Sequence, residues 1–196
     1  FPLGSFPSGA FPEGHWPLPP IFPVSLDEMK EHLRVTDTTE DFLIRDLILA
    51  ATNWAEMFQS RFFISKTTME YLDNFPDEIR PVWSTLQSVD SIKYYDADGA
   101  LQVLGSSDYR LDTDDTPARI TPAYGQTWPD TREMTNAVVV TYSAGYGLAS
   151  DVPDNTKAAL KLLVGHWYEH REAVSELSLQ EVPLAIKSLL WMQRIY

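Results

Sequence analysis

The residues best suited to chemistry lie together near the end of one predicted helix. His166, Glu169 and His170 form the pattern His-x-x-Glu-His, in which two histidines one helical turn apart can bind a single metal ion. The glutamate is then placed to act on a metal-bound water molecule, as in one class of zinc hydrolase. A zinc hydrolase is therefore the sharpest catalytic hypothesis that this sequence offers.

Two features argue against a zinc site. A third ligand should come from a separate, later helix, but the acids that follow are Glu172, Glu176 and Glu181, in or near a polar linker. The two imidazoles also lie beside an apolar stripe, where histidines commonly form hydrogen bonds within a helix interface. We therefore expect no bound metal, no cofactor and no catalytic residue.

Two acidic clusters are candidate cation sites. Residues 96–99 (Asp-Ala-Asp-Gly) resemble part of a calcium loop, but the later ligands are absent in register, so a hairpin turn is the preferred interpretation. Asp112, Asp114 and Asp115 could also hold a cation, although a solvated loop is more typical of such a cluster. No Ser-His-acid arrangement is recognisable, and no glycine-rich phosphate loop with lysine is present.

The histidine motif must be positioned by a long helix that follows a strand. Residues 138–142 are rich in valine and end in tyrosine, and Gly145 and Gly147 then permit a tight turn. Pro153 and Asp154 mark the start of the helix. Its apolar stripe follows spacings of three and four residues and comprises Leu160, Leu163, Val164 and Trp167.

Three further helices are predicted. Ser25 and Glu28 form a capping box at the start of a short helix that ends near Arg34. A longer helix begins near Thr38 or Thr39, and its apolar stripe extends over residues 44–58. Pro183 can begin the last helix.

The segment between the second and third helices has the pattern of β-structure. We expect strands within residues 64–72, 92–95, 101–103, 109–112, 118–121 and 136–142. The fold class is therefore α+β, a bundle of about four helices with an inserted antiparallel β module. The expected divisions are an extended Pro-rich arm (1–23), a helical part (24–61), the β module (62–145) and a second helical part that completes the bundle (146–196).

The arm carries a weak repeat of aromatic residues followed by proline. Phe-Pro recurs at Phe1, Phe6 and Phe11, and Trp16 precedes another proline. Proline excludes a helix or a central strand here, and the composition alone is also typical of a disordered leader. We interpret the segment as a docking or oligomerisation arm and expect Phe1, Phe6, Phe11 and Trp16 to contact neighbouring subunits.

The bulk composition excludes several classes of protein. A formal net charge of -13 and a pI near 4.6 argue against a protein that binds nucleic-acid phosphates, because affinity for phosphates comes from Lys and Arg side chains. The absence of cysteine excludes disulfides and thiolate metal sites. No apolar run approaches the roughly 18 residues of a membrane span, and we recognise no secretory signal, so no membrane partner is expected.

Several motifs, taken in order, resemble the head-tail connector (adaptor) proteins of tailed bacteriophages. Earlier segments of the likeness are residues 24–28, 90–96 and 108–112. The later motifs are Gly145-Tyr146-Gly147, Val152-Pro153, His166 to Glu169, and Arg171 to Val174. The arm has no counterpart in that pattern, and His170 stands where a plain polar residue is expected.

The resemblance implies a structural virion protein rather than an enzyme. Such a protein forms a homo-oligomeric ring, implied to have 12 copies, under the portal protein. It joins the DNA-filled capsid to a stopper, a tail-terminator or a tail tube protein. Double-stranded DNA then passes through an acidic channel without specific binding. The expected location is the virion neck, after assembly in the host cytoplasm.

Particular residues are candidates for these roles. We expect the end of the last helix and the residues after it to meet the portal, because aromatic and Arg side chains are good interface anchors. Those residues are Trp191, Arg194, Ile195 and Tyr196. The candidate channel-lining acids are Glu78, Asp112, Asp114 and Asp115.

One rival reading is a carbohydrate-binding or receptor-binding virion module that uses aromatic residues of the β module. The feature that would favour it is a cluster of these aromatic side chains on one solvent-exposed face. The candidates are Trp83, Tyr94, Tyr95, Tyr124 and Trp128.

Overall fold

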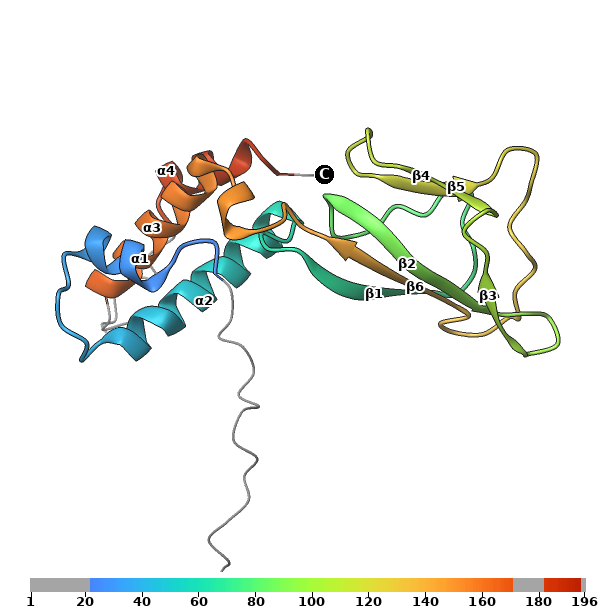
Figure 1. Ribbon diagram of the computed structural model, residues 1–196, viewed down its shortest axis with the longest axis horizontal. Helices are drawn as coiled ribbons and strands as arrows, with labels where there is room; N and C mark the ends of the chain where they lie inside the picture. Colours follow the sequence, from blue (N-terminus) through green and yellow to red (C-terminus); the bar gives the residue numbers. More distant parts are fainter. Residues whose placement is uncertain (1–21, 171–181, 195–196) are drawn as a thin grey trace, which may run out of the picture.

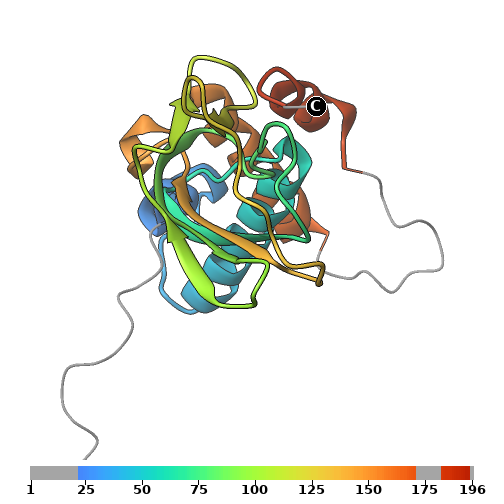
Figure 2. The same cartoon turned by 90° about the vertical axis from the view of Figure 1, so that its right-hand side faces the viewer.

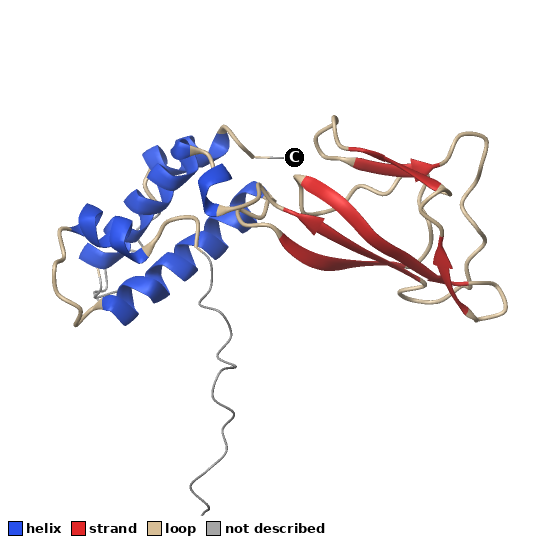
Figure 3. Cartoon of the chain, viewed as in Figure 1, coloured by secondary structure: helices blue, strands red, loops and turns tan. Residues whose placement is uncertain are grey.

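The chain folds into a helical bundle at one end and a β module at the other. The computed structural model describes residues 22–170 and 182–194. Figure 1 and Figure 3 show the helices gathered on one side and the strands on the other, along the longest axis of the molecule. The predicted α+β class, with a β module inserted into a helical bundle, is confirmed.

Among the described residues, four α-helices form the bundle. They are α1 (Leu26–Leu33), α2 (Asp41–Gln59), α3 (Asp154–Glu169) and α4 (Leu184–Trp191), with a short 3-10 helix, η1 (Ala149–Asp151), before α3. The capping box of α1 is confirmed. The Glu28 amide donates to Ser25 Oγ at 3.2 Å, and the Ser25 amide donates to Glu28 Oε2 at 2.8 Å.

The core of the bundle lies between α1, α2, α3 and α4, and Met29 of α1 is fully buried in it. The stripe predicted for the long helix faces it, with Leu160, Leu163 and Val164 buried and Trp167 partly buried. Gln59 on α2 is fully buried and donates its side-chain amide to the Leu190 carbonyl at 2.8 Å, which ties α4 to α2. The described chain begins at Phe22, which packs against this core.

The β module contains six strands. These are β1 (Lys66–Leu72), β2 (Leu86–Tyr95), β3 (Leu101–Leu104), β4 (Tyr109–Asp112), β5 (Arg119–Pro122) and β6 (Val138–Ala144). Four of them form an antiparallel sheet in the order β1-β6-β2-β3, and β4 pairs with β5. Seen from the β-module end, this sheet and the β4–β5 pair lie in front of the bundle (Figure 2).

The core of the β module is centred on a buried tyrosine. Tyr142 is fully buried, accepts a hydrogen bond from the Trp83 amide at 3.3 Å and donates to Glu70 Oε2 at 3.3 Å. Burial raises the pKa of the Tyr142 hydroxyl, and the nearby Glu70 carboxylate adds to the effect. Alternate residues of β6 enter this core, which explains the valine-rich sequence of the strand.

The chain crosses between the two cores twice. At the first crossing, Phe62 packs in the β core while the adjacent Phe63 is fully buried in the helical core. Buried Glu56 holds this crossing, because its carboxylate accepts from the Phe63 amide at 2.8 Å and from Lys66 Nζ at 2.9 Å. The second crossing is the turn at Gly145, between β6 and the third helix.

The second crossing lies against the first. The Gly145 amide donates to the Thr85 carbonyl at 3.0 Å, and the Ser65 amide donates to the Gly147 carbonyl at 2.9 Å. Arg61 donates to the Tyr146 hydroxyl at 2.9 Å and lies over its ring. In the part of the chain that is described, no helix is long and apolar enough to cross a membrane.

Replacing Gly145 with alanine should destabilise the fold by roughly 1–3 kcal/mol. Its φ is +135°, and an added Cβ would lie 2.7 Å from the Ser65 backbone. Gly125→Ala is the matched control, because Gly125 also has a positive φ (+75°) but has open space around it. Chemical denaturation of both variants tests this point, and equal losses would contradict the close approach.

Candidate functional site

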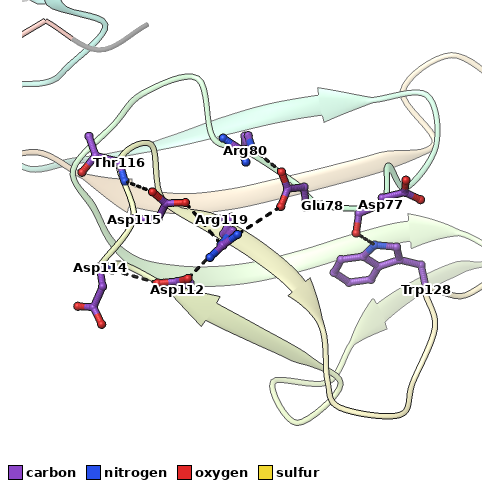
Figure 4. Close-up of polar contacts among 9 residues, drawn as sticks. All are labelled: Asp77, Glu78, Arg80, Asp112, Asp114, Asp115, Thr116, Arg119 and Trp128. Atoms are coloured by element: carbon purple, nitrogen blue, oxygen red, sulfur yellow. Dashed lines mark hydrogen bonds and ion pairs between the residues drawn. The ribbon is translucent and has the colours of Figure 1, made fainter.

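Three of the four predicted channel acids meet around one arginine of the β module. Arg119 Nε lies 3.0 Å from Asp112 Oδ2 and 3.7 Å from Asp115 Oδ2, and Arg119 Nη1 lies 4.0 Å from Glu78 Oε2. Arg80 adds a contact of 2.5 Å to Glu78. Figure 4 shows these side chains converging from β4, β5 and two loops, with the Asp114 carboxylate pointing away. We call Glu78, Asp112, Asp115 and Arg119 the Arg119 cluster.

Local hydrogen bonds explain how the loop presents these acids. The Asp114 amide donates to Asp112 Oδ1 at 3.2 Å, and the Thr116 amide donates to Asp115 Oδ1 at 2.9 Å. The hydrogen bond from Arg119 lowers the pKa of the Asp112 carboxyl, and the same contact raises the pKa of Arg119. The arginine contact therefore favours the ionised form of the Asp112 carboxyl.

The predicted portal-binding end of the chain lies on the bundle. Trp191, the last residue of α4, is 53% exposed, and its ring lies 6.0 Å from that of Phe58 on α2. The Arg194 guanidinium lies 5.0 Å from the Phe58 ring centroid and 5.1 Å from that of Trp191. These contacts organise the end of α4. Ile195 and Tyr196 lie outside the described residues.

The histidine motif forms a local pair at the end of α3. The ring centroids of His166 and His170 are 4.6 Å apart, and His170 Nδ1 lies 2.8 Å from the His166 carbonyl. Among the described residues, no group of three or more His, Asp or Glu side chains is placed to hold a metal ion. Three later acids weighed as a third ligand, Glu172, Glu176 and Glu181, lie outside those residues.

Four of the five aromatic residues of the rival receptor-binding hypothesis are only partly exposed. Trp83 stacks on Phe62 at 4.1 Å, and Trp128 stacks on Phe75 at 4.8 Å. Tyr94 also contacts Phe75 and packs against the β core, and Tyr95 is only partly exposed. Tyr124 alone among the five is nearly fully exposed, at 97%. The packing of the module accounts for most of these rings.

The first helices and strands match the model of a phage protein family. Residues 23–96 match the family model described as phage gp6-like head-tail connector protein. The resemblance of the sequence to head-tail connectors is thereby confirmed over this part of the chain. No curated protein sequence matches the chain.

Solved structures with a similar fold cover most of this chain. A chain in the neck of an empty gene transfer agent (GTA) particle, computed with C6 symmetry, has a TM-score of 0.72 at 21% identity. The match covers 88% of this chain and 90% of that chain. A chain in the virion of a native GTA particle gives the same values.

A third similar structure is the neck of a native GTA particle computed with C12 symmetry. Its TM-score is 0.70 at 22% identity, and the match covers 87% of this chain and 88% of that chain. The family and the three structures are described as connector, neck and virion proteins, and none of these descriptions names an enzymatic activity.

The structure also reveals exposed apolar residues that the sequence patterns did not single out. Met69 and Tyr71 on β1, and Leu101 and Val103 on β3, each expose more than half of their side chains. Alternation along β1 predicts which of its residues share a face. Only the order of the strands in the sheet shows which strands lie beside β1. The four candidate arm residues Phe1, Phe6, Phe11 and Trp16 lie outside the described residues.

Replacing Arg119 with alanine should raise the pKa of the Asp112 carboxyl toward its ordinary value, about 3.9. Because the folded-state pKa of Asp112 is lowered, its contribution to stability is present above the unfolded pKa. That contribution is lost as the pH falls through the folded value. The stability difference between wild type and variant should therefore be largest near neutral pH and shrink below about pH 4.

Carboxyl NMR titration and denaturation at several pH values measure both effects. Arg110→Ala is the matched control, because Arg110 is exposed on β4 and has no ion pair within the described residues. An unchanged Asp112 titration in Arg119→Ala would contradict the assigned contact.

Proposed function

We propose that this protein is a head-tail connector that forms a ring under the portal of a DNA-filled capsid and joins it to the next neck or tail component. The observation that carries the proposal is the fold match to virion and neck structures over 88% of the chain, at a TM-score of 0.72. The connector family model matched by residues 23–96 supports the same role independently.

The proposed ring has 12 copies. The C12 and C6 symmetries of the similar necks support a cyclic assembly. A cyclic ring needs two different patches on each subunit, so that each copy binds the next in the same way. An elongated subunit with separate helical and β ends has room for such patches on different elements.

The charge of the chain fits a protein that lets DNA pass. A net charge of -13 repels the phosphate backbone, whereas a basic lining would hold it. We assign Glu78, Asp112, Asp114 and Asp115 to the channel side of the ring. Arg80 and Arg119 neutralise part of the charge of these acids, so the surface remains acidic while its side chains stay ordered.

The end of α4 is the proposed contact with the portal. The described part of this segment, residues 182–194, carries Lys187 and Arg194 but no acid, in contrast to the rest of this acidic chain. Leu184, Trp191 and Met192 expose 78%, 53% and 67% of their side chains. The proposed portal interface consists of Trp191, Arg194, Ile195 and Tyr196.

The remaining assignments concern assembly. The opposite side of the ring would receive a stopper, a tail-terminator or a tail tube protein. The protein would be assembled in the host cytoplasm and remain in the virion neck.

Native mass measurement of the purified protein, alone and mixed with the portal protein of the same particle, tests the proposed function. The expected result is a closed oligomer of about 12 chains that forms a complex with the portal. A protein that stays monomeric under both conditions would overturn the proposal.

Truncation after Leu190 should abolish portal binding while leaving the subunit folded. The truncation removes Trp191 and all residues after it, whereas the buried α4 residues Ile186 and Leu190 remain. Co-sedimentation with the portal measures the binding, and circular dichroism checks the fold. Leu162→Ala, at a position on α3 that is 44% exposed, serves as the control. Unimpaired binding by the truncated chain would refute the assignment of this interface.

A further inference from the structure

One face of the four-stranded sheet carries a continuous row of side chains that no described element covers. Tyr71 on β1 pairs with Val139 on β6, Val139 with Lys93 on β2, and Lys93 with Val103 on β3. Directly paired residues of antiparallel strands lie on the same face. The opposite face holds Val138, Val140 and other residues of the β core, so this row points outward.

The face around this row is partly apolar: Met69 pairs with Thr141 and Thr141 with Ser91, whereas Leu101 pairs with Tyr95. Met69 and Leu101 lie on the same face, two residues from Tyr71 and Val103, and side chains two residues apart share a face. The four large apolar side chains are between 55% and 64% exposed. Open faces of antiparallel sheets usually carry polar residues. The exposed apolar side chains here form two pairs, one on each outer strand of the sheet, with Val139 and Lys93 between them. Exposed apolar patches of this kind mark interaction sites. We call Met69, Tyr71, Lys93, Leu101, Val103 and Val139 the outer sheet face.

We infer that the outer sheet face binds residues 1–21 of a neighbouring copy of this chain, the part of the arm that precedes Phe22. This inference rests on the proposed ring, and it names the contact that links one copy to the next. The arm and the outer sheet face are two different patches of one chain, so their contact can repeat around a closed ring.

The chemistry of the arm complements the outer sheet face. Phe1, Phe6, Phe11 and Trp16 are each followed by proline. Proline-rich segments dock on surfaces that carry aromatic and apolar side chains, because proline limits the conformational entropy lost on binding. Tyr71 supplies such a ring, and the aliphatic side chains around it supply apolar area.

The charges of the two surfaces also match. Glu13 is the only Asp, Glu, Lys or Arg residue among residues 1–21. Lys93 lies in the middle of the outer sheet face and has no ion-pair partner within the described residues. The one acid of the arm can therefore pair with Lys93, while the Asp90 carboxylate, which accepts from Ser143 on the same face at 3.3 Å, lies farther along β2.

The length of the arm allows it to reach another subunit. At about 3.1 Å per residue, 21 residues in polyproline conformation extend about 65 Å. The row across the four strands is only about 14 Å wide, since neighbouring strands lie about 4.8 Å apart. Attachment at Phe22, on the helical core, thus does not confine the arm to its own β module.

Disulfide cross-linking between two differently labelled chains tests the contact. The protein has no cysteine, so each introduced thiol is the only one in its subunit. One chain carries Phe1→Cys, Phe6→Cys, Phe11→Cys or Trp16→Cys in turn, and the other carries Val103→Cys. After mixed assembly and mild oxidation, we expect a dimer between the chains for at least one arm position. Its yield should be about tenfold or more above that with Tyr124→Cys, because docking raises the effective concentration of the thiols.

The outcomes separate this inference from the proposed function. Rings in which no arm position cross-links to Val103→Cys above the Tyr124→Cys control would overturn the arm contact and leave the connector role intact. In a further variant that carries an arm cysteine and Val103→Cys in the same chain, cross-linking only within single chains would also overturn it. Cross-links between chains in a preparation without rings would support the arm contact but contradict the proposed function.

A second experiment measures the energetic coupling of the two surfaces. Deletion of residues 1–21, and Tyr71→Glu combined with Val103→Glu, should each lower the fraction of chains in rings. The two changes together should have no larger effect than either alone, because both remove one contact. Tyr124→Glu should leave assembly unchanged. Additive losses, in variants whose melting shows that they remain folded, would contradict the inference.

Discussion

The arrangement of this molecule depends on the place where its two cores meet. Phe62 stacks on Trp83 in the β core, and the next residue, Phe63, is fully buried in the helical core. The buried Glu56 carboxylate accepts from the backbone between them and from Lys66. Moving either module relative to the other would remove an aromatic side chain from its core or leave a buried carboxylate without donors, and both changes are costly. The junction therefore ties two separately packed parts together at one place.

A fixed shape matters for the proposed assembly. A closed ring forms only when every copy is related to the next by the same rotation, so a loosely hinged subunit would favour open or irregular oligomers. The charge distribution also fits the proposed assembly. Acidic side chains such as Asp112 are held by Arg119, which orders them without reversing the sign of the surface. In contrast, the described residues at the end of α4 are free of acids and expose Trp191, as suits a surface that binds another protein.

The features that could be predicted from sequence are those with local causes. The capping box at Ser25, the turn at residues 96–99 and the buried stripe of α3 each arise from residues a few positions apart. The early part of β2 was not predicted, because Leu86 to Ser91 is largely polar and contains two register irregularities that break the alternation. The Arg119 cluster, the division of Phe62 and Phe63 between two cores, and the outer sheet face all depend on contacts between distant segments. No periodicity in a single sequence reveals such contacts.

A cryo-electron microscopy reconstruction of the purified protein bound to the portal of its own particle would test the central claim most directly. The account predicts a closed ring of identical subunits, each with its helical bundle and β module oriented as in the isolated chain. The end of α4 should lie against the portal, and the channel should be lined by acids. A monomer on the portal, an open helical array, or a ring whose channel is basic would contradict it.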